Sequence, residues 1–332
     1  MKLFYLYAFT LFFLFSCTKP KLVKIYGFAQ GTTYSISYYD KNGVEYGSQI
    51  DSILNVFNKS VSIYDSLSLI TFVNKSSEPV KADKFFIEIF ENAQKVSEET
   101  NGAFDITVAP LVNAFGFGFK NKEKLDSSHI DSLKKLVNFR YVIIKNGYIY
   151  KQYPSVALDF NAIAQGYSVD LISDFLENKG VKNYIVEIGG EVYAKGKKDD
   201  GKYWNVGIEK PLYNDLQREI KAKVKIENKA LATSGNYHKY YVENGVKYSH
   251  IIDPSTGYPV THSLLSVSVI ADNCTKADAY ATSFMVMGLN KSLLFLKNHK
   301  EFEAYFIYSD KEGNMKTYET EGLKELLTEQ KY

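Results

Sequence analysis

The chain has 332 residues, of which 45% are hydrophobic, and a formal net charge of +2. This apolar content is sufficient for a large core and excludes a globally disordered chain. The 40 basic and 38 acidic residues alternate along the sequence, so nothing indicates the clustered basic face of a nucleic-acid-binding protein. Aromatic residues make up 15% of the chain, which favours β-rich layers.

Residues 1–17 have the pattern of a bacterial lipoprotein signal peptide. The charged start, Met1-Lys2, precedes an almost wholly apolar stretch over residues 3–15, shorter than the ~20 residues that span a bilayer. Leu14-Phe-Ser-Cys17 resembles a lipobox, so we expect lipidation at Cys17 and a polar tether over residues 18–26. An uncleaved N-terminal anchor is the alternative. Both interpretations predict an exported, membrane-anchored protein that faces the periplasm, with the inner membrane as the expected location.

Hydrophobic periodicity and turn residues predict the elements of the N-terminal half. We expect a strand over residues 27–39 bent at Gly31, a helix over 49–61, a loop over 62–74, a helix that begins after Asp83 and ends at Asn101-Gly102, a helix over 126–137, and a hairpin over 141–150 that turns at Asn146-Gly147.

Asp105 is a lone carboxylate within the apolar segment 103–118. A buried carboxylate costs several kcal/mol unless it is hydrogen bonded. We therefore expect Asp105 to have a dedicated partner, and the alternative role is to tie down its own loop.

The segment Leu158–Asp170, LDFNAIAQGYSVD, is the centre of the sequence. The apolar run 155–158 leads into Asp159, and helical spacing of apolar residues then continues to Gly180. This pattern predicts a strand, a tight turn and a helix with Asn161 at its cap. A helix N-terminus offers N–H groups and a positive dipole to a phosphate, although a plain capped junction with a structural Asp159 fits equally well.

The sequence of the C-terminal half predicts further strands and hairpins. Two adjacent glycines, Gly189 and Gly190, allow a ligand to approach the backbone, although a plain hairpin also explains them. The predicted elements are strands over 184–188, 191–194, 204–209, 219–226 and 229–233, a turn over 232–236, a hairpin over 240–252 that turns at Asn244-Gly245, a strand over 266–270, a helix over 276–287, and a final helix, strand (304–308), hairpin and helix.

Two further features carry candidate chemistry. On the predicted helix 276–287, Asp278 and Thr282 lie one turn apart, so they can share a hard cation. Alternatively, Asp278 interacts with the helix dipole near the N-terminus, and the Thr282 hydroxyl bonds the helix backbone. His250 falls on a predicted strand, where a structural role is the alternative. Cys274 is expected to be a small core residue. No internal repeat or low-complexity linker interrupts residues 27–332, which predicts one continuous α+β domain.

Several separate motifs resemble one family, and together they extend over nearly the whole mature chain. Their order and spacing are similar to those of the ApbE family, the FAD:protein FMN transferases. The motifs are QGTTYSI at 30–36, SxYxxxSxIxxxN at 62–74, NGAFDITVAPLVNAFGFG at 101–118, LDFNAIAQGYSVD at 158–170, IVEIGGEVYAKG at 185–196, ATSGNYHKYY at 232–241, YSHIIDPSTGYP at 248–259 and ADAYATSFMVMG at 277–288.

The resemblance implies an ApbE-like, T-fold-like architecture of mixed or antiparallel sheets with packed helices. It also implies a Mg²⁺-dependent reaction in which a Thr or Ser hydroxyl of an acceptor protein attacks the FMN-side phosphorus of FAD. FMN becomes phosphoester-linked to the acceptor and AMP leaves. The implied partner is an exported acceptor, such as a redox-complex subunit or an FMN-binding domain.

By the same resemblance, Mg²⁺ is held by the carbonyl of Ala162, the Asp278 carboxylate and the Thr282 hydroxyl, and His250 is the candidate base for the attacking hydroxyl. Two positions depart from the common pattern: Gln165 stands where many members carry Lys, and Ser255 where many carry Arg. The residues implied to contact FAD are Gln30, Tyr64, Ala103, Phe104, Asp105, Asp159, Gln165, Gly189, Gly190 and Ile251.

Two alternatives remain at this stage. One is a FAD pyrophosphatase, in which water replaces the protein hydroxyl and FMN and AMP are released. The other is a non-catalytic flavin-binding surface lipoprotein. The presence of Asp278, Thr282 and His250 argues against the second, because a binding protein has no need of the metal ligands or the base.

Overall fold

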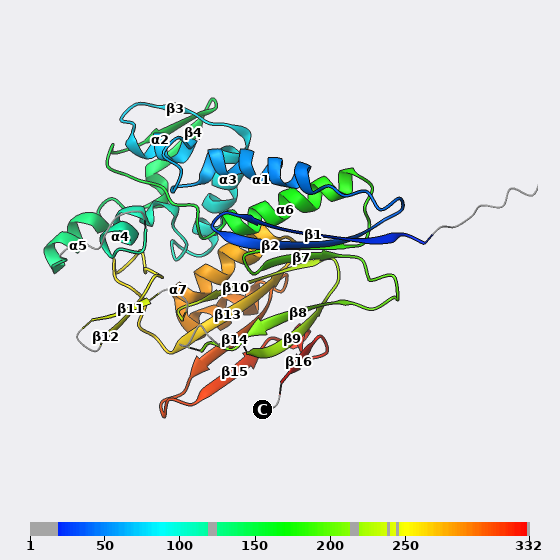
Figure 1. Cartoon of the computed structure of the whole chain (residues 1–332). Helices are drawn as coiled ribbons and strands as arrows, with labels where there is room; N and C mark the ends of the chain where they lie inside the picture. The colour runs from blue at the N-terminus through cyan, green and yellow to red at the C-terminus, as the bar shows by residue number, and fades with distance from the viewer. Residues whose placement is uncertain (1–18, 119–124, 213–218, 238–239, 244–245, 331–332) are drawn as a thin grey trace, which may run out of the picture.

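An eight-stranded antiparallel sheet organises the molecule (Figure 1). The structure is a computed structural model that describes residues 19–118, 125–212, 219–237, 240–243 and 246–330. In spatial order the sheet contains β1 (Lys21–Ala29), β2 (Thr32–Asp40), β6 (Tyr184–Ile188), β7 (Glu191–Lys195), β10 (Lys229–Gly235), β13 (Leu264–Ala271), β14 (Glu303–Ser309) and β15 (Met315–Glu319).

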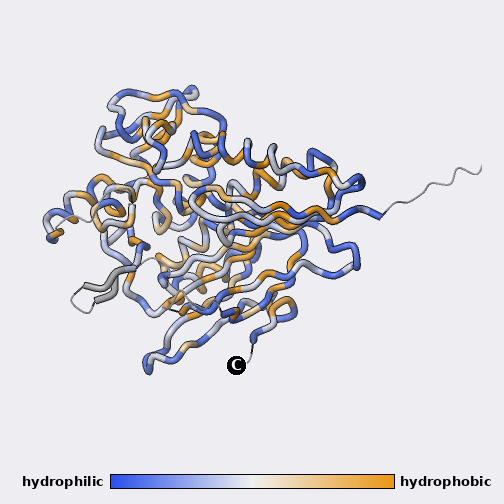
Figure 2. Tube along the Cα trace, in the orientation of Figure 1, coloured by the Kyte–Doolittle hydropathy of each residue, from blue (hydrophilic) through white to orange (hydrophobic). Residues whose placement is uncertain are grey.

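Helices cover one face of this sheet, and the large hydrophobic core lies between the two layers. α7 packs on β10 and β13, and α6 packs on β6 and β7 and against α7. Figure 2 shows apolar segments along the sheet and the helices, with hydrophilic segments in the peripheral turns. The bounds of the helices in this layer are α1 Gly47–Val61, α3 Lys84–Glu99, α6 Ala164–Asn178 and α7 Cys274–Asn298.

Smaller elements complete the fold. The sheet β16-β9-β8 builds a second cluster in which Trp204 and Ile208 are buried together with Val192 of β7 and Ile307 of β14. The remaining elements are α2 Leu69–Lys75, β3 Val80–Lys81, η1 Ile106–Val108, α4 Ala109–Ala114, α5 Ser127–Lys134, η2 Phe139–Tyr141, β4 Val142–Lys145, β5 Tyr148–Lys151, β8 Trp204–Glu209, β9 Ile220–Ile226, β11 Tyr240–Glu243, β12 Val246–Ser249, η3 Glu321–Leu323 and β16 Leu327–Glu329.

Local signals in the sequence placed several elements well. Asp83 caps α3, because its side chain accepts a hydrogen bond from the backbone N–H of Phe86 at 2.8 Å. Asn101 and Gly102 follow α3 with φ of 53° and 79°, as a helix stop requires. The hairpin β4–β5 turns at Asn146-Gly147. The predicted turn at Asn244-Gly245 lies outside the described residues.

The N-terminal prediction was wrong in two respects. Residues 27–39 are not one bent strand: β1 and β2 form a hairpin, whose turn at Gln30-Gly31 has φ of 53° and 76°. The segment expected as a tether through residue 26 belongs to the sheet from Lys21 onward, since β1 pairs with β2 from Lys21 to Ala29. Alternating buried and exposed positions in β1 explain why this segment forms a strand.

Other differences concern the ends of elements. Residues 69–75, expected as loop, form α2, and β10 continues through the expected turn as far as Gly235. His250 lies just after β12 rather than within a strand. The helix expected before residue 304 is the end of α7 beyond a kink at Gly288, and the expected final helix is replaced by η3 and β16.

In the central segment, residues 155–158 form no strand and α6 begins at Ala164 with Ile163 as its N-cap, so Asn161 is not the cap. Gly180 ends α6 as expected, with φ of 82°. Within the described residues, no helix has the length and apolar character needed to cross a membrane.

Candidate functional site

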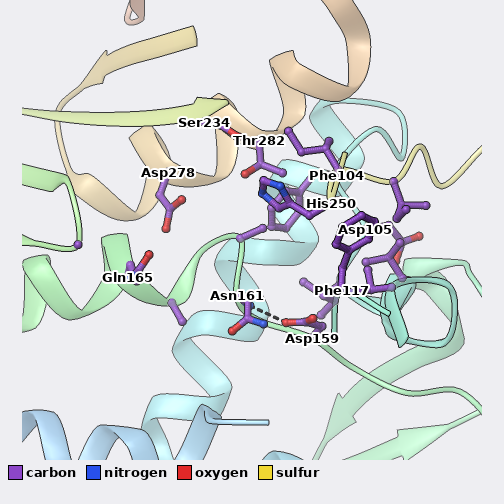
Figure 3. Close-up of a pocket in the computed structure, with 18 of the residues that line it drawn as sticks. Phe104, Asp105, Phe117, Asp159, Asn161, Gln165, Ser234, His250, Asp278 and Thr282 are labelled. Atoms are coloured by element: carbon purple, nitrogen blue, oxygen red, sulfur yellow. Dashed lines mark hydrogen bonds between the residues drawn. The ribbon is translucent and has the colours of Figure 1, made fainter. Parts of the chain in front are cut away.

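A cavity of about 690 Å³ opens where the central segment, α7 and the turns after β1, β6 and β12 meet (Figure 3). It brings together the residues that the sequence predicted for the site, with the exception of Gly190. Those that line it are Gln30, Tyr64, Ala103, Phe104, Asp105, Asp159, Ala162, Gln165, Gly189, His250, Ile251, Asp278 and Thr282.

Gly190 lies in the turn between β6 and β7 beside the cavity. Its φ is 108°, and its N–H donates to Oε1 of Glu187 at 2.8 Å. The plain-hairpin interpretation of this glycine therefore fits the structure. Gly189 does line the cavity. A Cβ at Gly189 would lie 2.5 Å from Nε2 of Gln165, so glycine is needed for Gln165 to occupy its place.

The candidate cation site lies where the start of α6 crosses α7. The Asp278 carboxyl is buried, and its Oδ2 accepts a hydrogen bond of 3.0 Å from the backbone N–H of Gly166. A Cβ on Gly166 would lie 2.3 Å from the carbonyl oxygen of Cys274 and 2.7 Å from Cβ of Asp278. Gly166 therefore sets the closest approach of the two helices, and sequence analysis missed this role.

Asp170 fixes the other end of the same helix crossing. Its Oδ1 accepts from the N–H of Cys274 at 2.8 Å, and its Oδ2 accepts from the N–H and the hydroxyl of Thr275 at 2.8 and 2.5 Å. A carboxylate at this position satisfies N-terminal N–H groups of α7 and favours its dipole. Burial nevertheless outweighs these donors and raises the pKa of Asp170 to about 6.

Burial raises the pKa of two acidic side chains in the cavity, Asp278 and Glu191. Burial raises the pKa of Asp278, although the N–H of Gly166 opposes the shift. Burial also raises the pKa of Glu191, the first residue of β7, and the charge of Asp278 adds to the effect. Sequence analysis missed Glu191. The only signal was an acidic residue between a glycine pair and an apolar strand.

Among the described residues, no three or more His, Cys, Asp or Glu side chains form a metal-binding group. A cation at the α6–α7 crossing would depend on hydroxyl and carbonyl oxygens besides carboxylate. The predicted set offers these three kinds of oxygen, from Thr282, Ala162 and Asp278. Such hard oxygen ligands suit Mg²⁺.

Asp105 has the dedicated partners that its burial demanded. Oδ1 accepts from the N–H and the hydroxyl of Thr107 at 2.7 and 2.6 Å, and Oδ2 accepts from the N–H of Phe139 at 2.8 Å. Burial raises the pKa of the Asp105 carboxyl against these hydrogen bonds. The carboxylate ties its own loop to Phe139, and this shapes the cavity wall at Ala103 and Phe104.

Asp159 connects two walls of the cavity. Its N–H donates to the carbonyl of Ile106 at 2.8 Å, and its Oδ1 accepts from the N–H of Asn161 at 2.8 Å (Figure 3). Asn161 also donates to the hydroxyl of Tyr64 at 3.4 Å. Tyr64 is 57% exposed; partial burial raises its pKa, and the charge of Asp159 contributes. This arrangement places a largely exposed aromatic ring beside a buried carboxylate.

Gln30 presents an unsatisfied donor at the cavity. Its Nε2 is buried and has no hydrogen-bond partner within the described part of the chain, while its Oε1 accepts from the hydroxyl of Ser168 at 3.4 Å. A buried unpaired N–H costs about 1–3 kcal/mol, so this group is suited to a ligand. His250 also lines the cavity, and its ring packs against Phe117 with centroids 6.4 Å apart.

The family model for the ApbE family matches residues 30–306. A FAD:protein FMN transferase of Vibrio cholerae is 35% identical over 293 residues, which cover 86% of this chain and 87% of that protein. The chain belongs to the ApbE family. A FAD:protein FMN transferase of Escherichia coli strain K12 is 30% identical over 299 residues, which cover 88% of this chain and 84% of that protein.

Solved structures of ApbE proteins share the fold. The flavin transferase ApbE of Vibrio cholerae matches with a TM-score of 0.83 at 31% identity, over 92% of this chain and 99% of that chain. The apo form of the flavinyl transferase ApbE of Pseudomonas stutzeri gives a TM-score of 0.83 at 30% identity, over 93% and 97% of the two chains. The predicted α+β, ApbE-like fold is thus confirmed.

Proposed function

We propose that the protein is a FAD:protein FMN transferase that uses Mg²⁺ and acts on an exported acceptor protein. One observation carries the proposal: a single cavity unites a buried carboxylate and hydroxyl on α7, the turn before α6, an unpaired amide donor and a histidine. The relatives described above, named as flavin transferases, support the same activity.

Ala162, Asp278 and Thr282 are the proposed Mg²⁺ ligands. The hydrogen bond from Gly166 engages Oδ2 of Asp278, which leaves the other carboxylate oxygen for the cation. Bound Mg²⁺ would neutralise charge on the pyrophosphate during phosphoryl transfer. The chain's own part is to hold three oxygen ligands at the crossing of α6 and α7, where Gly166 and Asp170 fix the geometry.

The walls of the cavity are the proposed FAD site. Gln30 donates its buried Nε2–H to the nucleotide. The neighbouring walls, at Phe104 and Ile251, are buried and apolar, so they exclude water from the donor. Tyr64, largely exposed at the same cavity, offers a ring face for stacking.

His250 is the proposed base. One ring nitrogen takes the proton from the Thr or Ser hydroxyl of the acceptor as its oxygen attacks the FMN-side phosphorus. A new P–O bond forms to the acceptor, the P–O bond to AMP breaks, and AMP leaves with the electron pair. Because the nucleophile belongs to the acceptor, transfer and hydrolysis use the same residues of this chain.

The purified full chain, incubated with FAD, Mg²⁺ and a Thr-containing acceptor domain, should yield an acceptor that stays fluorescent in a denaturing gel, with one AMP released per acceptor labelled. Asp278→Ala should abolish both signals. Release of FMN and AMP without labelled acceptor would instead identify a FAD pyrophosphatase. Binding of FAD without any turnover would identify a flavin-binding lipoprotein.

Residues 1–17 support a second, separate part of the proposal, which is export and lipidation at Cys17 so that the domain faces the periplasm from the inner membrane. The apolar stretch and the lipobox-like sequence carry it. In cells supplied with labelled fatty acid, the wild-type protein should incorporate the label and Cys17→Ser should not. A wild-type protein that takes up no label and keeps residues 1–17 would contradict lipid anchoring and favour an uncleaved anchor.

A further inference from the structure

Glu191 is a buried acid that has no role in the proposed reaction. It is the first residue of β7 and is only 7% exposed. Its Oε2 has no hydrogen-bond partner within the described residues, and the side chain lines the cavity. Burying an unpaired carboxylate is costly. A purely structural glutamate would be expected to have protein donors on both oxygens, which Glu191 lacks.

The structure places Glu191 next to the candidate cation site. Cys274, one turn before Asp278 on α7, directs its Sγ at the carbonyl of Val192, the residue after Glu191, at 3.6 Å. The start of α7 thus lies on the start of β7. Asp278 and Glu191 therefore line the same cavity from two adjoining elements.

Within the described lining of the cavity, no fixed positive charge offsets this pair. Among the described residues that line the cavity there is neither a lysine nor an arginine. At position 165, where the resemblance pointed to a common Lys, this chain has a neutral glutamine. In Figure 3 the side chains of Gln165 and Asp278 point toward one another. Two buried carboxylates without a fixed cation form a site that favours a mobile divalent cation.

We propose that Glu191 supplies a second carboxylate to the divalent-cation site that Asp278, Thr282 and Ala162 form. This inference rests on the proposed metal site and adds a ligand group from a different element, β7. Mg²⁺ is commonly bound through one or two carboxylates together with phosphate oxygens and water. The cation joins β7 to the α6–α7 crossing, and it relieves the cost of burying the Glu191 carboxylate.

The test is a calorimetric titration of the purified full chain with Mg²⁺ alone and with Mn²⁺ alone, in the absence of FAD. Glu191→Gln keeps the size of the side chain and removes its charge, so we expect at least a tenfold loss of cation affinity. Asp278→Asn should lose binding altogether. Glu187→Gln is the matched control, since Glu187 on neighbouring β6 already accepts a hydrogen bond from Gly190; its affinity should stay within twofold of wild type.

A second readout separates a ligand from a structural residue. Without metal, Glu191→Gln should unfold at the same or a higher temperature than wild type, because the variant no longer buries an unpaired acid, and added Mg²⁺ should stabilise it less. Gln165→Lys places a fixed cation in the cavity and should weaken Mg²⁺ binding. It provides a test even if Glu191→Gln does not fold.

Two results would overturn the assignment: cation affinity of Glu191→Gln within twofold of wild type, or a Gln165→Lys variant that binds Mg²⁺ as tightly as wild type. Failure of the proposed transferase function looks different. In that case the titrations keep their pattern, but no acceptor is labelled. If Asp278→Asn binds the cation normally, the underlying metal site is wrong, and the role of Glu191 falls with it.

Discussion

Gly166→Ala tests the close approach of α6 and α7 in the candidate site. The added Cβ would lie 2.3 Å from the carbonyl oxygen of Cys274, where ordinary contacts begin at 3.4 Å, so α6 and α7 must separate by roughly 1 Å. Overpacking of this kind costs about 1–3 kcal/mol. Alanine returns about 1 kcal/mol through its higher helix propensity. The net loss of unfolding free energy should therefore be about 0–2 kcal/mol.

The same separation should affect turnover more than stability. It moves the carbonyl of Ala162 away from the carboxylate of Asp278 and weakens the 3.0 Å hydrogen bond between Gly166 and Asp278. A misplacement of about 1 Å can cost roughly 100-fold in rate, because Mg²⁺ demands near-ideal geometry. We expect a loss of about 100-fold in the rate of acceptor labelling, with cation affinity reduced in parallel.

Urea unfolding and the rate of acceptor labelling measure the two effects. Gly47→Ala is the matched control, since Gly47 lies at the start of α1 and a Cβ there would meet only Cγ2 of Ile25, at an ordinary 3.6 Å. It should match wild type in rate and equal or exceed it in stability. A Gly166→Ala enzyme with wild-type rate and cation affinity would refute the argument that this contact sets the geometry of the site.

Three further predictions concern groups that hold the cavity walls. The pKa of Asp170 is raised to about 6, so the protonated carboxyl contributes about 3 kcal/mol to the free energy of unfolding. This contribution is fully present below pH ~4 and is lost as pH rises through ~6. Urea unfolding of Asp170→Asn should lack this pH dependence; a variant whose stability varies with pH as in wild type would contradict the prediction. Asp105→Asn should lower the unfolding free energy by about 1–3 kcal/mol, because one amide oxygen cannot serve Thr107 and Phe139 together; unchanged stability would contradict this. The Asn74 side chain hydrogen bonds both backbone groups of Leu158, the residue before Asp159 in the cavity wall. Asn74→Ala should therefore cost about 2 kcal/mol or more and weaken FAD binding in a fluorescence titration; unchanged FAD affinity would mean that this wall does not depend on Asn74.

Asn74 also explains why part of the central segment could not be predicted. Its side-chain amide donates to the carbonyl of Leu158 at 2.8 Å and accepts from the N–H of Leu158 at 2.7 Å. One side chain thus satisfies the backbone groups that a neighbouring strand would satisfy. Val156, Leu158 and Phe160 are fully buried, so their alternation matches that of a strand. An alternating pattern shows which side chains are buried, but it does not show which groups hydrogen bond to the backbone N–H and C=O.

The β1–β2 hairpin was missed for a related reason. Its turn uses Gln30 at a φ of 53°, a conformation for which Asn, Asp or Gly are the usual signals. The sequence therefore suggested a bend at Gly31 instead of a turn. The same conformation brings the Gln30 side chain to the cavity. The unusual turn residue and the predicted ligand contact are thus one feature of the structure.

Local spacing in the sequence was sufficient to place side chains on one element. Asp278 and Thr282 share a helix face that the sequence predicted from spacing alone, and Asp83 capped its helix as expected. Glu191 could not be found in this way, because the burial of a charged residue depends on what packs above it. Only the placement of α7 on the start of β7 shows that this glutamate faces the cavity.

The charges of the cavity also limit how the substrate can enter. Among the described residues that line it are four carboxylates, those of Asp105, Asp159, Glu191 and Asp278, and no lysine or arginine. Backbone N–H groups satisfy Asp105 and Asp159. Asp278 also accepts a backbone N–H hydrogen bond, but in their ionised forms Asp278 and Glu191 repel an anionic pyrophosphate unless a cation lies between them. Binding of FAD should therefore be coupled to binding of the divalent cation, and this coupling follows from an acidic residue on β7 and a glutamine at position 165 rather than from any single motif.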